Sequence, residues 1–221
     1  MYMIKAVLFD LDGTICNSLG DIAAAVNFTL EKLGFKTHEV DAFKYFVGNG
    51  IPKMVERALP EEHRTERELK KALEIFMPYY KEHSSDLTYK YDGISELLAQ
   101  LKERGIKIAV CTNKAEPLAI EVVKDLCGDI FDLIFGQREG LPGKPDPTLA
   151  KLLMKELEVE PQECIFMGDS GVDVQTAVNS GAVAVGVLWG YRDIAELNEN
   201  GAEFVIEKPL DLINLIDALN S

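Results

Sequence analysis

Two carboxylates that follow an apolar run near the N-terminus are the first residues whose spacing could do chemistry. Asp10 and Asp12 stand two positions apart, directly after the run Ile4 to Phe9, and Gly13 follows them. Because residues two apart in a strand project to the same side, we expect the two side chains to lie together at a strand end. Two anions this close repel each other unless a cation or a proton lies between them. The pair is a candidate for metal binding or proton transfer, although a lone Asp-x-Asp is equally well explained as a polar turn.

Three further polar clusters follow later apolar runs. They are Thr112-Asn113-Lys114, Gly143-Lys144-Pro145-Asp146-Pro147 and Gly168-Asp169-Ser170-Gly171-Val172-Asp173. In open parallel sheets, ligands bind outside the carboxyl ends of the strands, so the four clusters would share one edge. Each cluster alone is explained by a helix cap or a solvated loop charge. All of them at one edge of an acidic protein indicate a site for chemistry.

The elements that must position these clusters alternate between strand and helix. Strands are expected over Ile4–Phe9, Ile106–Cys111, Leu133–Phe135, Ile165–Met167 and Ala182–Val187. Helices are expected over Ile94–Arg104, Pro117–Leu126, Pro147–Leu157 and Val172–Ser180. Continuous apolar strands separated by helices predict an α/β fold with a doubly wound, mainly parallel, Rossmann-like sheet that is covered on both faces.

Residues 17–86 interrupt this alternation with a block that is helical throughout. Ser18-Leu19-Gly20-Asp21 has the form of a capping box and opens a helix that Gly34 ends. Three more helices are expected: Val40–Phe46, one from Pro52 to Leu59, and one from Thr65 that Pro78 kinks or ends. The first strand has no partner within this block. We therefore expect an all-helical inserted domain, 17–86, within a discontinuous sheet domain, 1–16 and 87–221.

Composition limits the classes of partner. The 221 residues carry a formal net charge of −14, which repels nucleic acid and anionic membranes at long range. The four cysteines are scattered without a C-x-x-C pair and are expected to be reduced thiols, and no stretch has the form of a leader or a membrane span. These features predict a cytoplasmic protein that does not bind nucleic acid or membranes.

The four clusters, in this order, resemble the four motifs of the haloacid dehalogenase superfamily. The resemblance covers the whole sheet domain, and the helical block matches the position of the family's helical cap. Val47-Gly48-Asn49-Gly50 and Thr112-Asn113-Lys114 are most similar to the phosphoglycolate phosphatase branch. The chain departs from the usual pattern at Asn17, where many relatives have Asp, and at Asp92, where Pro often precedes Gly93.

This resemblance implies a Mg²⁺-dependent phosphatase that hydrolyses a small phosphorylated metabolite through an aspartyl-phosphate. Asp10 would be the nucleophile, and Asp12 the general acid and base, with its carbonyl on the metal. By resemblance the catalytic residues are Asp10, Asp12, Thr112 and Lys144, the metal residues are Asp10, Asp12, Asp169 and Asp173, and the substrate-binding residues are Thr14, Gly48, Asn49, Gly50, Thr112, Asn113 and Lys144. Whether Asp173 ligates the metal directly stays open.

Formal charge gives a further expectation about protonation. Four aspartates, one Mg²⁺ and one lysine sum to −1, and a site that must also accept a phosphate dianion favours one protonated carboxyl group. Asp12 is the expected carrier of that proton. Phosphoglycolate is the favoured substrate, with the Gly48-Asn49-Gly50 loop as the expected recognition element and Lys53 or Arg57 as possible added charges.

Alternative functions follow from the same residues. A dehalogenase of this superfamily would lack the second carboxylate, so Asp12 argues against it. A sugar phosphomutase would keep all four motifs, and a pyrophosphatase or nucleotidase would have a similar cap. A non-enzymatic phosphoacceptor regulatory protein also combines aspartate, Mg²⁺, threonine and lysine, but it has neither an inserted cap nor a proton donor two residues after the phosphoacceptor.

Overall fold

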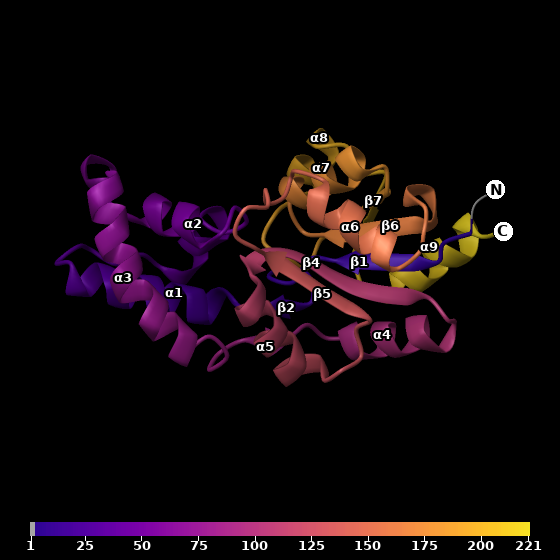
Figure 1. Ribbon diagram of the computed structural model, residues 1–221, viewed down its shortest axis with the longest axis horizontal. Coiled ribbons are helices and arrows are strands. Elements are labelled where there is room, and N and C mark those ends of the chain that lie inside the picture. The colour runs from indigo at the N-terminus through magenta and orange to yellow at the C-terminus, as the bar shows by residue number, and fades with distance from the viewer. Residues whose placement is uncertain (1–2) are drawn as a thin grey trace.

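The central sheet is parallel, as the sequence predicts. The structure is a computed structural model that describes residues 3–221. Within these residues the main sheet has six strands in the order β5-β4-β1-β6-β7-β8 (Figure 1). Their bounds are β1 Ala6–Phe9, β4 Lys107–Ala115, β5 Leu133–Gln137, β6 Cys164–Gly168, β7 Val183–Val187 and β8 Phe204–Ile206. All pairings between neighbouring strands are parallel.

β1 is one of the two central strands of the sheet. Ala6 is in register with Lys107 of β4 on one side and with Cys164 of β6 on the other. Every residue of β1 is buried, because helices cover both faces of the sheet and neighbouring strands cover both edges. This is why the strand is a continuous apolar run rather than an alternating one. Asp10 follows at its carboxyl end.

Three helices cover each face of the sheet. One apolar core joins the sheet to α4 (Ile94–Glu103), α5 (Glu116–Cys127) and α9 (Asp211–Leu219). A second core on the opposite face joins it to α6 (Thr148–Glu156), α7 (Gly171–Ser180) and α8 (Ile194–Glu199). Figure 1 shows α6, α7 and α8 above the strands and α4 and α5 below them. The doubly wound architecture is confirmed, and β8, α8 and α9 are additional elements that the sequence analysis did not predict.

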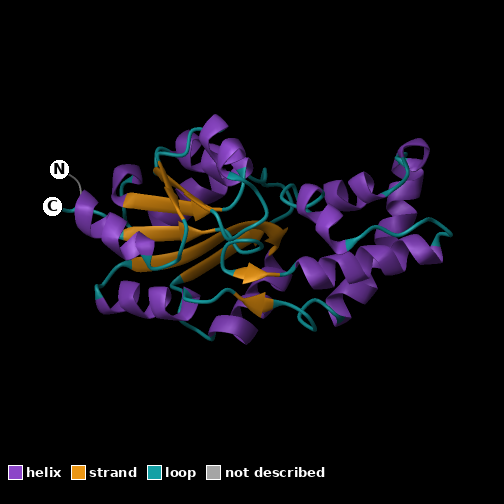
Figure 2. Cartoon of the chain, turned by 180° about the vertical axis from the view of Figure 1, so that it is seen from behind, coloured by secondary structure: helices purple, strands orange, loops and turns teal. Residues whose placement is uncertain are grey.

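A separate group of helices, here called the helical unit (residues 19–82), lies beyond the carboxyl ends of the strands. It consists of α1 (Leu19–Lys32), α2 (Ile51–Ala58), α3 (Glu66–Glu82) and 3₁₀ helices over Val40–Tyr45 and Glu61–His63. Figure 2 shows the strand arrows pointing toward this unit. Its own core includes Phe43, Phe76 and Tyr80, all essentially buried.

Two short antiparallel strands lie where the chain enters and leaves the helical unit. They are β2 (Cys16–Asn17) and β3 (Tyr89–Lys90). The buried Asp21 carboxylate of α1 accepts hydrogen bonds from the backbone N–H of Leu87 (2.8 Å) and of Thr88 (2.8 Å). The Thr88 hydroxyl donates a third, at 2.6 Å. Asp21 therefore fixes the returning chain to the start of α1.

The capping box expected at Ser18 is absent. Ser18 precedes α1, but its side chain makes no capping hydrogen bond; its Oγ donates instead to Asp12 Oδ1 at 2.6 Å. Asp21, the other half of the expected box, is engaged with the returning chain. Tertiary partners outcompete the local pairing because both side chains are buried.

Pro78 does not end its helix, so of the two expected outcomes the end is wrong and the kink stays a prediction. α3 continues past it to Glu82. Proline inside a helix costs about 3 kcal/mol, but Phe76 and Tyr80 are buried on either side of it. Packing of this face holds the last turn in place. No helix between residues 3 and 221 is both long and apolar enough to span a bilayer.

Candidate active site

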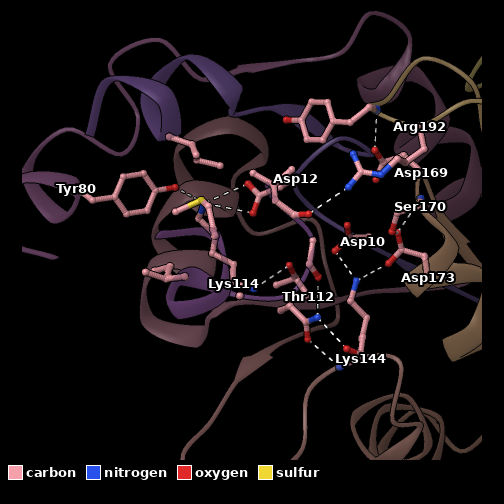
Figure 3. A pocket seen from close by; sticks show the side chains of 18 residues that line it. Asp10, Asp12, Tyr80, Thr112, Lys114, Lys144, Asp169, Ser170, Asp173 and Arg192 are labelled. Atoms are coloured by element: carbon pink, nitrogen blue, oxygen red, sulfur yellow. Dashed lines mark hydrogen bonds and ion pairs between the residues drawn. The ribbon is translucent and has the colours of Figure 1, made fainter. Parts of the chain in front are cut away.

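The four polar clusters meet at the carboxyl edge of the sheet, where a cavity separates it from the helical unit (Figure 3). The parallel topology brings them together, since β1, β4 and β6 are neighbours and all end at this edge. From the sheet domain the cavity is lined by Asp10, Asp12, Thr112, Asn113, Lys114, Lys144, Asp169, Ser170, Asp173, Tyr191 and Arg192. From the helical unit and its loops it is lined by Ile22, Val47, Gly48, Gly50, Ile51, Met54 and Tyr80.

Lys144 is the cation at the base of the cavity. Its Nζ donates to Asp10 Oδ1 at 2.7 Å and to Asp173 Oδ1 at 2.6 Å, and all three side chains are buried. Burial works to lower the pKa of Lys144, but the two carboxylates outweigh it and the pKa is raised. Lys144 therefore stays charged and holds Asp10 in one position.

One lysine does not neutralise the carboxylates around it. Burial, followed by the nearby Asp173, raises the pKa of Asp10 to about 7, although Lys144 opposes the shift. Burial, followed by Asp173 and Asp10, also raises the pKa of Asp169 well above its ordinary value. The cluster carries an excess of negative charge that a cation or a proton must balance.

Asp10, Asp169 and Asp173 form a donor set suited to a metal ion. Each offers a carboxylate oxygen, and the three oxygens lie within 4.8 Å of one another in a buried position. Asp169 Oδ2 accepts from the Tyr191 N–H at 2.7 Å. Asp173 uses Oδ2 for the Ser170 N–H and hydroxyl, at 3.1 and 2.6 Å, and Oδ1 for Lys144. Hard oxygen donors of this kind fit a divalent cation such as Mg²⁺.

The Asp12 carboxylate lies outside this cluster. Its Oδ1 accepts from Ser18 Oγ at 2.6 Å and from Lys114 Nζ at 3.1 Å. The three-carboxylate group does not include it, so of the expected metal residues Asp12 does not contribute its carboxylate there. Lys114 also changes the charge count: with this second lysine the formal sum rises from −1 to zero, and the incoming phosphate dianion alone then makes the site negative.

Thr112 and Asn113 belong to the buried part of β4 and line the cavity. Thr112 Oγ1 accepts from the Lys114 N–H at 3.2 Å. Asn113 Nδ2 donates to the carbonyls of Gly48, at 2.9 Å, and Lys144, at 3.0 Å, while its Oδ1 accepts from the Lys144 N–H at 2.8 Å. The Asn113 side chain thus joins two loops at the site, and the role of Asn113 as a substrate-binding residue stays a prediction.

The loop before α2 is only partly in the expected place. Gly48 and Gly50 line the cavity, and both have positive φ, 110° and 82°, which glycine alone adopts readily. Asn49 does not line it, and its Oδ1 accepts from Arg57 Nη2 at 2.8 Å. Lys53 pairs with Glu56 on the surface. Neither Arg57 nor Lys53 supplies charge to the cavity, contrary to expectation, because both are engaged elsewhere.

Thr14 is also misplaced by the sequence analysis. It is completely buried and does not line the cavity. Its carbonyl accepts from Trp189 Nε1 at 2.9 Å, and its hydroxyl has no hydrogen-bond partner among residues 3–221. The turn after Asp12 folds inward here, so Thr14 supports the turn instead of facing a ligand.

Two glycines allow the carboxylates to pack closely. A Cβ built on Gly190 would lie 2.2 Å from Asp169 Cβ, and one built on Gly168 would lie 2.2 Å from Asp173 Cβ. A larger residue at either position would displace a carboxylate. These glycines are part of the site although they carry no functional group.

Four cationic or phenolic residues of the cavity were not predicted as site residues: Lys114, Tyr80, Tyr191 and Arg192. The Arg192 guanidinium donates to the carbonyls of Lys44 and, at 3.2 Å, Val47, which joins the loop after β7 to the helical unit. Lys114 could have been found from its place in the Thr112-Asn113-Lys114 cluster. Tyr80 and Arg192 have no local signal, because only the tertiary fold brings them to the cavity.

The comparisons with known proteins all point to the same family. Residues 7–187 match the family model described as haloacid dehalogenase-like hydrolase. The chain is 37% identical over 203 residues to the phosphoglycolate phosphatase of Neisseria meningitidis serogroup A, covering 90% of this chain and 86% of the relative. It is 33% identical over 215 residues to the phosphoglycolate phosphatase of Aquifex aeolicus, covering 97% of both.

A solved structure gives the same picture at the level of the fold. A protein from Lactobacillus delbrueckii subsp. bulgaricus, provisionally named phosphoglycolate phosphatase, superposes with a TM-score of 0.92 at 31% identity. The match covers 97% of this chain and 98% of that one. The similarity therefore includes the helical unit as well as the sheet.

Proposed function

Because this chain belongs to the haloacid dehalogenase-like hydrolase family and is a phosphoric monoester hydrolase, we propose that it hydrolyses 2-phosphoglycolate with Mg²⁺, through an aspartyl-phosphate on Asp10. The observation that carries the proposal is the environment of Asp10. Its carboxylate lies at the end of β1, held by Lys144 at 2.7 Å, and faces a cavity that Thr112 and Asp12 also line.

Asp10 suits the role of covalent nucleophile when a cation offsets the surrounding negative charge. Burial and Asp173 raise its pKa to about 7 without a metal, and a bound divalent cation would favour the ionised, nucleophilic form. Bonding to Lys144 fixes one oxygen and leaves the other for attack. A carboxylate needs no separate base to become a nucleophile.

Asp10 and Asp169 are the proposed carboxylate ligands of Mg²⁺, with the Asp12 carbonyl beside them. Mg²⁺ supplies charge neutralisation for a phosphoryl group at this position. We place Asp173 outside the ligand set, because Lys144 and Ser170 already occupy its two oxygens. Its role is then to orient Lys144.

Two proton transfers complete the proposed reaction. As an Asp10 oxygen bonds to phosphorus, the bond to the leaving oxygen breaks, and that oxygen takes a proton from Asp12. Water then attacks the phosphorus while Asp12 takes its proton, and phosphate leaves with the Asp10 carboxylate restored. Thr112 and Lys144 would hold the non-bridging phosphoryl oxygens, since both line the cavity beside Asp10.

The helical unit, as part of a proposed cap domain over 17–86, would select a small substrate. Ile22, Val47, Ile51 and Met54 line its side of the cavity. Lys114 and Arg192 provide positive charge near the same space, which favours a substrate with a second anionic group. The relatives named phosphoglycolate phosphatase point to the carboxylate of that compound.

The test is a panel of phosphate esters assayed with Mg²⁺ and with EDTA. We expect 2-phosphoglycolate to have the highest kcat/KM, activity to require Mg²⁺, and Asp10→Asn to lower kcat by at least about 10³. Incubation with substrate followed by acid quench and peptide mapping should place the phosphoryl group on Asp10. Activity in EDTA, or near-normal turnover by Asp10→Asn, would refute the mechanism; a different best ester would refute only the substrate.

A further inference from the structure

Lys114 is a buried cation of the site that takes no part in the proton transfers proposed above. It lies near the end of β4, and its side chain is only 3% exposed. Burying a lone ammonium group is costly unless partners compensate it. The hydrogen-bond partners of Lys114 therefore indicate its role.

Those partners come from both parts of the molecule. Lys114 Nζ donates to Asp12 at 3.1 Å (Oδ1) and 3.4 Å (Oδ2), and to the Tyr80 hydroxyl at 2.6 Å. Asp12 belongs to the sheet domain, whereas Tyr80 is a fully buried residue of α3 in the helical unit. Figure 3 shows Lys114 between them at the cavity wall.

The arrangement places the Lys114 ammonium group between two acceptors, the Asp12 carboxyl group and the Tyr80 hydroxyl. Burial opposes the charged form of Lys114, but Asp12 and Tyr80 outweigh it and its pKa is raised. Burial raises the pKa of Tyr80 to about 12, so it accepts from Lys114 as a phenol. Ser18, at the start of α1, donates to the same Asp12 oxygen at 2.6 Å. Ser18 directly precedes α1 and Lys114 contacts Tyr80 of α3, so each partner of the Asp12 carboxyl group is also connected to the helical unit.

We propose that Lys114 is a positioning residue that aims the Asp12 carboxyl group at the leaving oxygen, and that its hydrogen bond to Tyr80 makes this aim depend on the placement of α3. The inference rests on the proposed function, because it requires Asp12 to be the proton donor. A proton donor must lie within hydrogen-bond reach of the atom it protonates. When α3 moves away, Lys114 loses one partner and Asp12 loses the geometry that protonates a poor leaving group.

Two aryl phosphates whose aryl groups carry no additional charge distinguish this role from substrate binding and from folding. p-Nitrophenyl phosphate has a good leaving group that needs little proton donation, whereas phenyl phosphate has a poor one. Neither carries a second anion for Lys114 to bind. The measured quantity is the ratio of kcat/KM for phenyl phosphate to that for p-nitrophenyl phosphate, since kcat/KM reports transfer of the phosphoryl group to the enzyme.

The variants are Lys114→Met, which removes the charge, and Tyr80→Phe, which removes one hydroxyl. We expect Lys114→Met to lower the ratio at least about tenfold and Tyr80→Phe about threefold, since Ser18 and, in the second variant, Lys114 still contact Asp12. Asp12→Asn serves as the reference for complete loss of the donor.

Matched controls test whether any lysine or tyrosine change would do the same. Tyr79→Phe alters the neighbouring residue of α3, whose ring stacks on Phe28. Lys90→Met removes a lysine that donates to the Leu126 carbonyl at 2.7 Å, away from the site. Neither control should change the ratio.

The outcomes separate the inference from its premise. If Asp12→Asn lowers the ratio but Lys114→Met and Tyr80→Phe lower both substrates equally, Lys114 is only structural and the inference is wrong. If Asp12→Asn itself lowers both substrates equally, the proton-donor role of Asp12 fails and the inference falls with it. Should Lys114→Met not fold, Tyr80→Phe alone decides, because it deletes a single atom.

Discussion

We expect the metal-free protein to lose stability as the pH rises. Burial and Asp173 raise the pKa of Asp10 from 3.8 to about 7 in the metal-free fold. A raised folded-state pKa means that the folded protein binds this proton more tightly than the unfolded chain does. The resulting stabilisation is complete below about pH 4 and is lost as the pH rises through about 7.

The size of the effect follows from the same values. Each pH unit of difference is worth about 1.4 kcal/mol, so Asp10 contributes about 4 kcal/mol in all. About 3 kcal/mol of this falls between pH 5 and pH 8. For a chain of this length the loss corresponds to a decrease in Tm of about 6–12 °C.

Asp10→Asn isolates the contribution from that of other titrating groups. Urea unfolding of both proteins in EDTA, at pH values from 5 to 8, gives the difference in free energy of unfolding, wild type minus variant. We expect this difference to decrease by about 3 kcal/mol over the range. The same free-energy difference also includes the effect of Asp10 on Asp169. The pKa of Asp169 is raised by burial and by the neighbouring carboxylates. Saturating Mg²⁺ should stabilise the wild type more at pH 8 than at pH 5, because the ion binds the ionised carboxylates.

A difference that stays constant or increases with pH in EDTA would refute this reasoning. It would mean that the cluster relieves its charge by another route, for instance by opening to water. Equal stabilisation by Mg²⁺ at both pH values would likewise show that the ion does not bind at these carboxylates.

Three further predictions concern the metal site and the junction of the two parts. Gly190→Ala should destabilise the fold by about 2 kcal/mol and raise the Mg²⁺ concentration for half-maximal activity at least about tenfold. The reason is that the new Cβ would lie 2.2 Å from Asp169 Cβ. Gly186→Ala is the control, and an equal shift in that variant would argue against a local effect. Asp21→Ala should cost about 3 kcal/mol in urea unfolding, since it leaves the Thr88 N–H and hydroxyl without their acceptor; unchanged stability would show that water replaces the carboxylate. Excess Ca²⁺ at fixed Mg²⁺ should inhibit turnover, because Ca²⁺ takes more ligands at longer distances; activity with Ca²⁺ equal to that with Mg²⁺ would contradict this.

The sheet and the location of the site were predictable because both depend on patterns that are continuous along the chain. A strand that is buried on both faces must be apolar throughout, and Ala6–Phe9 has this composition. Once the strands are parallel, the residues that follow them must share an edge, so Asp10, Thr112 and Asp169 meet without further information. β8 escaped prediction because three residues, Phe204–Ile206, carry too little pattern to be recognised.

What could not be predicted depends on partners far apart in sequence. Asp12 is fixed by Lys114, 102 positions away, and Lys114 by Tyr80, 34 positions away. Ser18 has the local form of a helix cap, yet it donates to Asp12 because the fold offers a buried carboxylate at 2.6 Å. A helix-capping hydrogen bond contributes about 1 kcal/mol, which is less than a charge-assisted hydrogen bond to a buried carboxylate contributes.

The central position of β1 means that this strand gains both of its neighbours only long after its own synthesis. Ala6–Phe9 pairs with Lys107–Ala115 and with Cys164–Gly168, so its two edges stay open until those segments have been synthesised. The helical unit, synthesised between them, has a core largely of its own and can fold first. A nascent chain that stalls before β6 would expose an apolar strand edge, which makes it a substrate for chaperones.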